Sequence, residues 1–246
     1  MNFLNPKVLS YIPARSGSKR IRGKNIRDFL GKPLIAYTIE QMLKISYVDK
    51  VIVDTNSEEI AEIAKKYGAD VPFLRPQHLA EDGSNVIDSI FYTLDKLEKD
   101  EGYIPTHLFL PQATSPLREI EDVDACWKLM QETDATTVIT MTPTHPKLYH
   151  LSPEGYTLLV NGSESHSNNT QTWPKAYIPN GAFYVVEIGA LRKEGVIITK
   201  KTRAVINPKW RSVDLDTPEE WVMAEILYKH REEVKKRTQE IDNDCV

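Results

Sequence analysis

A cluster of basic residues surrounds a short, flexible loop near the start of the chain. The cations are Arg15, Lys19, Arg22 and Lys24. The loop itself is Ser-Gly-Ser at residues 16–18, whose small side chains let the backbone turn its N–H groups inward, and the apolar run at 8–12 before it is typical of a buried strand. A solvated basic turn is the alternative, but the whole chain carries a net charge of −4. Cations gathered around such a loop in an acidic chain favour an anion-binding site, and a triphosphate fits it best.

The spacing of the glycines separates this loop from the common phosphate-binding motifs. Five residues lie between Gly17 and Gly23, and Asn25 follows Lys24, whereas the P-loop needs a shorter gap and a Ser or Thr after its lysine. The dinucleotide fingerprint needs several glycines, and Gly17 is alone in its window. We therefore predict that long cationic side chains, not a ring of backbone amides, neutralise most of the phosphate charge.

Two aspartates near the end of the chain have the spacing of a metal-ion site. Asp214 and Asp216 lie two positions apart, so on a strand or an extended turn their carboxylates point to the same side. Hard oxygen ligands suit Mg²⁺, which also binds substrate phosphates. Alternatively, Asp216 or Thr217 caps a helix that starts at Pro218. Capping leaves Asp214 unexplained, so we predict that the pair binds a metal ion.

Short β-rich runs alternate with helical patterns through most of the chain. Strands are predicted at residues 8–12, 50–54, 71–73, 107–111 and 136–141. Helices are predicted near residues 33–44, 57–67, 85–99 and 120–132. This alternation predicts βαβ units and a parallel sheet that is essentially complete at residue 141.

Three polar segments follow predicted strands. The basic loop comes after the first strand, Asp54 ends the second, and residues 112–115 follow the strand at 107–111. In open α/β sheets, ligands bind beyond the carboxyl ends of the strands. We therefore expect these segments to face one crevice.

The regular pattern breaks down beyond residue 142. Residues 143–176 are rich in proline, serine and asparagine and are unsuited to a core. An insert of this length is either a plain surface loop or a functional excursion. A final helix is predicted at residues 218–237, with Trp221, Ala224 and Tyr228 among its apolar residues and a charged tail after them, and its predicted role is structural.

The composition is that of a globular protein. Of the 246 residues, 41% are hydrophobic and 27% are charged, which suits one α/β domain over residues 1–246. The net negative charge argues against nucleic-acid binding. Cys126 and Cys245 have no metal-ligand or redox spacing, so both are predicted to be free thiols. With no cationic start before a long apolar stretch, we expect no membrane association and a cytoplasmic location.

Five motifs follow one another along nearly the whole chain. They are IPARSGSKRIRGKN at 12–25 with DFLGKPLI at 28–35, LRP at 74–76 with LAED at 79–82, QATSPLR at 112–118, PNGAFY at 179–184, and VDLDTPEE at 213–220. Together they resemble the acylneuraminate cytidylyltransferases, the enzymes that make CMP-sialic acid and its bacterial relatives. The resemblance implies a Rossmann-like three-layer sandwich of the nucleotide-diphospho-sugar transferase type, with a mostly parallel sheet. It also implies that residues 143–176 form an arm that packs on the second subunit of a homodimer.

The basic loop, the aspartate pair and this resemblance predict nucleotidyl transfer from CTP. An oxygen of the acceptor attacks the α-phosphorus and pyrophosphate leaves, a reaction that depends on positioning and charge neutralisation. Arg15, Lys19 and Lys24 are expected to hold the triphosphate and stabilise the departing pyrophosphate. Asp214 and Asp216 are expected to bind Mg²⁺ or Mn²⁺, and Asp216 is the preferred acceptor of the proton.

The resemblance implies two further sets of binding residues. Those for the nucleotide are Ala14, Arg15, Ser16, Lys24, Asn25, Arg75, Ser84 and Asn85. Those for the acceptor sugar are Gln112, Ser115 and Asn180. Taken without the resemblance, Arg75 would be read as part of a common turn and Gln112 as a loop-stabilising amide.

The chain departs from the family pattern at one position. Many members that activate sialate carry Arg immediately before Pro-Asn-Gly, and this chain has Ile178 there. A planar sugar carboxylate thereby loses a bidentate partner. Either Lys147, Lys175 or Lys201 replaces it as a point charge, or the acceptor differs from N-acetylneuraminate. The predicted acceptor is accordingly a 2-keto-3-deoxy nonulosonic acid of the sialic or legionaminic type.

Two alternatives to this function stay open. One is a nucleotidyltransferase that acts on Kdo or on a sugar 1-phosphate. The other is a catalytically silent protein that binds nucleotide sugars, although such a protein has no need of both the aspartate pair and the complete basic loop. In each case the partners are small molecules.

Overall fold

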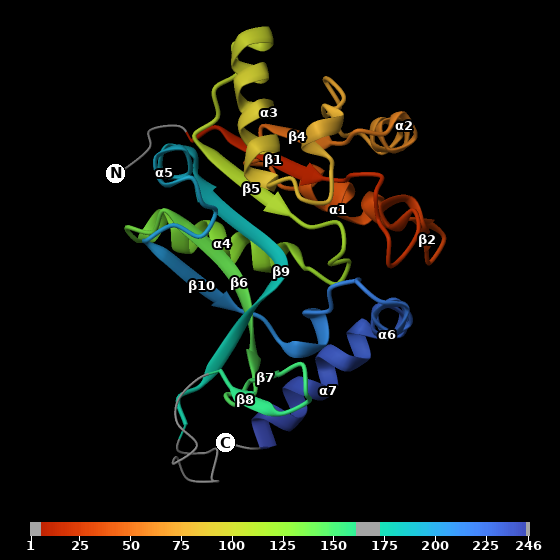
Figure 1. Ribbon diagram of the computed structural model, residues 1–246, viewed down its shortest axis with the longest axis vertical. Helices are drawn as coiled ribbons and strands as arrows, with labels where there is room; N and C mark the ends of the chain where they lie inside the picture. The colour runs from red at the N-terminus through yellow and green to blue at the C-terminus, as the bar shows by residue number, and fades with distance from the viewer. Residues whose placement is uncertain (1–5, 161–172, 245–246) are drawn as a thin grey trace.

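The computed structural model describes residues 6–160 and 173–244, in which strands alternate with helices (Figure 1). The strands are β1 (Val8–Pro13), β2 (Asp28–Phe29), β3 (Lys32–Pro33), β4 (Lys50–Asp54), β5 (His107–Pro111), β6 (Thr137–Thr144), β7 (Tyr149–Leu151), β8 (Thr157–Leu159), β9 (Ala176–Glu187) and β10 (Thr202–Ile206). The α-helices are α1 (Leu34–Leu43), α2 (Glu58–Lys66), α3 (Val86–Glu101), α4 (Ile120–Glu132), α5 (Ile188–Glu194), α6 (Pro218–Lys229) and α7 (Arg231–Asp244). Short 3₁₀ helices are η1 (Lys24–Ile26), η2 (Gln77–Leu79) and η4 (Lys209–Arg211).

The main sheet of the described residues has six strands in the order β10-β6-β9-β5-β1-β4. β1 is parallel to β4 and β5, and β10 is parallel to β6. β9 pairs antiparallel with both of its neighbours, β5 and β6. The sheet is therefore mixed and mostly parallel, which confirms the predicted fold class.

Helices cover both faces of the sheet and make the three layers. Side chains alternate along each strand, so Val8 and Ile12 of β1 join a core with α1, α2 and α4, whereas Leu9 and Tyr11 join another core with α3 and α5. All four of these side chains are fully buried. Because both faces are covered, the strands read as nearly continuous apolar runs, as at residues 107–111.

Residues 71–73, predicted as a strand, do not form one. The neighbouring Asp70 meets the sheet through an isolated bridge to Ile52. Pro72 has no N–H to donate to a ladder, so pairing cannot continue through this segment.

The prediction that the sheet is complete at residue 141 is also wrong. β9 enters between β5 and β6, and β10 extends the sheet beyond β6. The Pro-Asn-Gly motif at 179–181 lies inside β9, where the pairing register shifts between Ile139 and Met141. Gly181 has a φ of +71°, a conformation that glycine adopts readily, so this turn-like motif is accommodated within a strand.

The final segment forms two helices instead of the single one predicted at 218–237. α6 ends at Lys229, and α7, which is mostly charged, lacks an apolar stripe that would continue the packing of α6. Thr217 caps α6, because its Oγ1 accepts from the Glu220 N–H at 3.3 Å and the Glu220 carboxylate accepts from the Thr217 N–H at 2.7 Å. This capping box settles the choice between Asp216 and Thr217 as N-cap.

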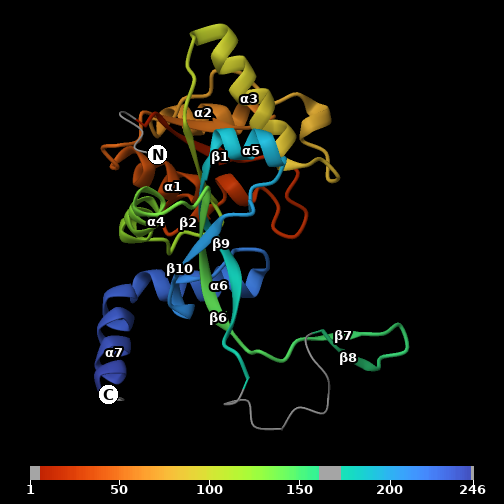
Figure 2. The ribbon, with the colours of Figure 1, turned by 90° about the vertical axis from the view of Figure 1, so that its left-hand side faces the viewer.

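The described part of the segment 143–176, which was predicted to be an arm, includes extensions of two strands of the sheet and a hairpin. β6 runs on to Thr144 and β9 begins at Ala176, and between them β7 and β8 pair as an antiparallel hairpin. Figure 2 shows this hairpin standing away from the layered body. Its apolar side chains Leu151 and Tyr156 are 71% and 72% exposed. The rest of the predicted arm, at residues 161–172, lies outside the described residues.

None of the described helices is both long and apolar enough to cross a membrane. Cys126 is buried in α4 as a free thiol, as predicted. Burial raises the pKa of this thiol, so it stays protonated and takes the part of a small apolar side chain. Cys245 lies outside the described residues.

Candidate active site

A cleft of about 530 Å³ lies beyond the carboxyl ends of β1 and β5. A volume of this size is typical of small-molecule sites. Segments from four parts of the sequence line it, and they include Arg15, Lys19, Lys24, Asn25, Arg75, Ser84, Gln112 and Asp216. The structure therefore brings the basic loop, the segment between α2 and α3, the loop after β5 and one of the paired aspartates together. Asp54, which ends β4, lies buried beneath this cleft.

The first half of the basic loop is neutralised by Asp82. Arg15 Nη1 donates to Asp82 Oδ1 at 2.9 Å and to the Ala80 carbonyl at 3.2 Å, and Lys19 forms an ion pair with Asp82 Oδ2. The hydrogen bond from Lys19 and that from Arg15 lower the pKa of the exposed Asp82 carboxyl. Asn25 Nδ2 donates to the Arg15 carbonyl at 3.1 Å and so ties the loop to η1. Asp82 is not predicted as a site residue, although it belongs to the LAED motif.

The second half of the loop is joined to the aspartate pair. Lys24 Nζ donates to the Leu215 carbonyl at 2.8 Å and to Asp216 Oδ1 at 2.9 Å, while Arg20 Nη1 pairs with Asp216 Oδ2 at 3.0 Å. Burial acts to raise the pKa of Asp216, but the hydrogen bond and charge of Lys24 and the charge of Arg20 outweigh it and hold that pKa below its usual value. Arg20 also lines the cleft. The sequence analysis did not single it out, and its place in the same basic run is the signal that could have found it.

Asp214 lies in a different environment from Asp216. It is largely buried, and its Oδ1 atom has no hydrogen-bond partner in the described structure. Burial raises the pKa of Asp214, a hydrogen bond from Thr114 lowers it, and the charge of Asp216 raises it again. A Cβ atom on Gly181 would lie 3.4 Å from Asp214 Oδ2, so the backbone approaches this carboxylate closely.

The aspartate pair meets part of the requirement for a metal ion. The unpaired oxygen of Asp214 is a free hard ligand, which fits Mg²⁺ or Mn²⁺. Both carboxylate oxygens of Asp216 are paired with cations, so a metal ion would have to share or replace them. Within residues 6–160 and 173–244, no group of three or more His, Cys, Asp or Glu side chains is arranged to hold a metal. A metal bound here would therefore take its remaining ligands from phosphate and water.

The other predicted nucleotide residues have varied surroundings. Ala14 is fully buried, and its N–H donates to the Asp54 carbonyl at 2.9 Å. Within the basic loop, the Ser16 N–H donates to Asn56 Oδ1 at 3.1 Å. Ser84 lines the cleft and donates to the His78 carbonyl at 2.7 Å, whereas Asn85 Oδ1 accepts from Ile87 and caps α3. The capping bond is sufficient to explain the position of the Asn85 side chain, and no ligand contact is needed to explain it.

The three predicted acceptor residues are not gathered in one place. Gln112 lines the cleft, but Ser115 is buried and lines a separate pocket against α1 and α7. Asn180 is buried in β9, where its Oδ1 accepts from Thr140 at 2.6 Å and its Nδ2 donates to Ser212 at 3.0 Å. These bonds tie β9 to β6 and to the segment that leads to Asp214.

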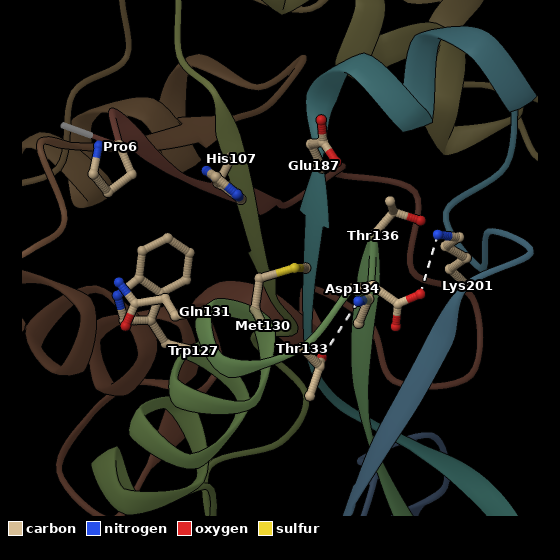
Figure 3. Close-up of a pocket in the computed structure, with 11 residues that line it drawn as sticks. Pro6, His107, Trp127, Met130, Gln131, Thr133, Asp134, Thr136, Glu187 and Lys201 are labelled. Carbon is tan, nitrogen blue, oxygen red and sulfur yellow. Dashed lines mark hydrogen bonds and ion pairs between the residues drawn. The ribbon is translucent and has the colours of Figure 1, made fainter. Parts of the chain in front are cut away.

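A third pocket, of about 300 Å³, lies at the opposite edge of the sheet, where β5, β6 and β10 begin (Figure 3). Apart from Lys201, which the sequence analysis raised as a replacement for the missing arginine, none of the predicted site residues is among those described as lining it. Burial lowers the pKa of His107 there to about 4, so the ring is neutral at physiological pH. Lys201 also lies at this edge and pairs with Asp134 at 3.1 Å. Lys201 is thus too far from the cleft to replace the arginine that is missing at Ile178, contrary to one of the alternatives raised from the sequence.

A family model described as cytidylyltransferase matches residues 10–159, which is more than half of the 246-residue chain. The chain belongs to the cytidylyltransferase family. This cytidylyltransferase is 32% identical over 234 residues to the CMP-N,N'-diacetyllegionaminic acid synthase of Legionella pneumophila, an alignment that covers 92% of this chain and 98% of that protein. It is also 32% identical over 226 residues to a pseudaminic acid cytidylyltransferase of Campylobacter jejuni, with 91% and 97% covered.

A solved structure supports the fold of this cytidylyltransferase. The structure of CMP:2-keto-3-deoxy-manno-octonic acid synthetase complexed with CTP superposes with a TM-score of 0.67 over 92% of this chain and 99% of that one. The two sequences are 17% identical, so this likeness establishes the shared architecture alone.

Proposed function

We propose that this cytidylyltransferase transfers CMP from CTP to a 2-keto-3-deoxy nonulosonic acid and releases pyrophosphate. The observation that carries the proposal is the contact of Lys24 with Asp216, which joins the basic loop to the aspartate pair at one cleft. A triphosphate in the basic loop would thereby lie beside the carboxylates. The names of the relatives, a legionaminic acid derivative synthase and a pseudaminic acid cytidylyltransferase, support the class of acceptor.

The basic loop binds the triphosphate by exchanging one anion for another. Asp82 holds Arg15 and Lys19 with their charged groups directed at one carboxylate. A triphosphate offers more negative charge than one carboxylate and would take over these contacts. As the bond from the α-phosphorus to the leaving oxygen breaks, the same cations stabilise the charge that builds up on the pyrophosphate.

The aspartate pair serves the attacking side of the reaction. Asp214 and Asp216 would hold Mg²⁺ or Mn²⁺, which when bound supplies positive charge beside the α-phosphate. The hydroxyl of the acceptor must lose a proton as its oxygen bonds to phosphorus, and a carboxylate of this pair is the proposed acceptor of that proton. Asp216, which lines the cleft, is the proposed acceptor of the proton, and Asp214, whose pKa burial raises, is the alternative.

The proposal includes a homodimer in which residues 143–176 reach a second subunit. The β7–β8 hairpin stands away from the layered body and exposes apolar side chains, among them Leu151 and Tyr156. When a partner covers apolar side chains on a projecting hairpin, they are removed from water and the complex is stabilised. A second copy of this chain is the partner that we propose.

A substrate panel tests the proposed reaction. Purified protein with Mg²⁺ is incubated with CTP, UTP or GTP and with sialic, legionaminic or pseudaminic acid, Kdo or a sugar 1-phosphate, and pyrophosphate release is measured. We expect release with CTP and a nonulosonic acid, and EDTA should stop it. The EDTA-treated enzyme should recover when excess Mg²⁺ is returned, which separates metal removal from denaturation.

Each other outcome favours a different function. Release with UTP and a sugar 1-phosphate, but not with CTP and any nonulosonic acid, would refute the cytidylyl proposal. Release of pyrophosphate with Kdo and with none of the other acceptors would show that Kdo is the acceptor. Binding of CMP-sugars without turnover of any substrate, and without dependence on Mg²⁺, would indicate a silent binding protein.

A further inference from the structure

A carboxylate lies in the part of the cleft that is proposed to bind the triphosphate. Asp82 belongs to the loop between η2 and α3 and lines the cleft together with Arg15 and Lys19. Its Oδ1 atom accepts from Arg15 Nη1 at 2.9 Å, and its Oδ2 atom forms an ion pair with Lys19. Both oxygens of one carboxylate are therefore paired with cations that are expected to contact the phosphates.

Asp82 differs from Asp216, which pairs with the other half of the basic loop. Asp216 would hold a metal ion when the substrate is bound, so its charge has a use in the complex. The charge of Asp82 has no such use, because it lies against the cations that the phosphates need, and like charges repel. Hydrogen bonds from Lys19 and Arg15 lower the pKa of Asp82, so the carboxylate is ionised at neutral pH. A cleft that only had to bind a triphosphate tightly would do so better with a neutral residue at this position.

The contacts of Asp82 can be exchanged for contacts to phosphate. The side chains of Asp82 and Lys19 are 52% and 81% exposed, and that of Arg15 is 38% exposed. An ion pair between exposed side chains is weak and changes an equilibrium constant by no more than about fivefold. A ligand with several negative charges can therefore displace Asp82 from the two cations, and Asp82 can return to them when that ligand leaves.

Pyrophosphate is the product whose release this exchange would affect. When the bond between the α-phosphorus and the bridging oxygen breaks, pyrophosphate is left on Arg15 and Lys19, and slow release of a tightly held product limits turnover in many enzymes. A carboxylate on the same chain, beside the same cations, competes with pyrophosphate at a high effective concentration. We propose that Asp82 is an internal competitor for the β- and γ-phosphates that takes back Arg15 and Lys19 and so promotes the release of pyrophosphate. This inference rests on the proposed binding of CTP at the basic loop.

Calorimetry of Asp82→Asn tests this inference by the sign of its effect. The substitution keeps the volume of the side chain and removes its charge. Affinities for CTP and for inorganic pyrophosphate, measured with Mg²⁺ and without an acceptor sugar, should rise by roughly twofold to thirtyfold, because two exposed ion pairs no longer have to be broken. The affinity for CMP, which lacks the β- and γ-phosphates, should stay unchanged. A merely structural Asp82 predicts the opposite sign, since a loop that has lost a support would bind CTP less tightly.

Asp134→Asn is the matched control. Asp134 is also an exposed carboxylate that pairs with two cations, Lys201 at 3.1 Å and Arg203 at 3.5 Å, and its pKa is likewise lowered by hydrogen bonding to Lys201. It lines the pocket at the opposite edge of the sheet. The control variant should leave the affinities for CTP, pyrophosphate and CMP unchanged, which separates competition within the cleft from the loss of one negative charge anywhere on the protein.

The release step and the contact with Lys19 are tested separately. In stopped-flow measurements, pyrophosphate should dissociate more slowly from Asp82→Asn than from the wild-type protein, and a gain in affinity that came only from faster association would overturn the role in release. In a Lys19→Ala background one of the two ion pairs is already absent, so adding Asp82→Asn should raise the affinity for CTP by a smaller factor than it does in the wild type. An equal gain in both backgrounds would mean that Asp82 acts by its charge at a distance, and the inference would be wrong.

The outcomes separate this inference from the proposed function. Unchanged or lower affinity for CTP and pyrophosphate in Asp82→Asn would overturn the inference even if CMP transfer is observed. A loss of affinity that occurs only with Mg²⁺ present would also overturn it, because Asp82 would then bind the metal–phosphate complex. Failure to release pyrophosphate with any acceptor, together with the expected gain in affinity in Asp82→Asn, would overturn the proposed reaction and leave the role of Asp82 as a competitor for phosphates standing.

Discussion

Replacing Lys24 with alanine tests the junction between the basic loop and the aspartate pair. The ammonium group donates to the Leu215 carbonyl at 2.8 Å and to Asp216 at 2.9 Å, and 15% of the side chain is exposed. The substitution removes both bonds. Arg20, at 3.0 Å, still pairs with Asp216, so the carboxylate is not left without a partner.

The expected effects follow from this geometry. Hydrogen bonds to charged groups contribute about 1.5–3 kcal/mol to the free energy of unfolding. In a chain of this size, that loss lowers Tm by about 3 to 12 °C. Because the ammonium group would also neutralise the departing pyrophosphate, kcat/KM should fall by roughly tenfold to a thousandfold.

Lys19→Ala provides the contrast, since its side chain is 81% exposed and pairs with an exposed carboxylate. It should lower kcat/KM to a similar extent and leave Tm nearly unchanged. Lys201→Ala, which breaks an exposed ion pair at the opposite edge of the sheet, should change neither quantity. Pyrophosphate release and thermal melting measure the two effects. Wild-type kinetics for both Lys24→Ala and Lys19→Ala would show that the loop is a solvated basic turn with no part in the reaction.

Three further predictions address the metal pair, the helix cap and the arm. Asp214→Asn should abolish most turnover and raise the Mg²⁺ concentration needed for activity. Because burial raises the pKa of Asp214, the ionised form weakens the fold above that pKa, so the neutral variant should keep or raise Tm at neutral pH; unchanged Mg²⁺ dependence would make the pair structural. Thr217→Ala should lower stability by about 1 kcal/mol with little effect on turnover, and an unchanged melting curve would contradict the role of the capping box. Light scattering should give the mass of a homodimer. If the protein is instead a monomer and keeps full activity after residues 143–176 are shortened, that segment is a plain surface loop.

Local sequence patterns predicted much of the fold. The strands at 50–54 and 107–111 and the helix at 120–132 have the bounds that the apolar runs indicated, because these elements form from neighbouring residues whose side chains share a face. The start of the helix at Pro218 could be predicted for the same reason. Thr217, which caps the helix, and Glu220, which completes the capping box, lie within one turn of each other. β9 was missed because its decisive contacts are distant: its Pro-Asn-Gly motif lies within a strand only because β5 and β6 pair on either side of it.

The sequence by itself determined that the chain is an α/β protein with a cationic loop, a spaced pair of aspartates and five ordered motifs of one family, because residue types and short spacings express these properties directly. Tertiary structure alone decided how those groups are paired. Asp82 lies 67 positions from Arg15, and Asp216 lies 192 positions from Lys24. The different environments of Asp214 and Asp216, and the ion pair of the buried Arg75 with Asp54, likewise depend on burial and on side chains that meet only after the sheet has formed. Free energies of ionisation and orientation depend on such neighbours, and no local pattern of residues specifies them.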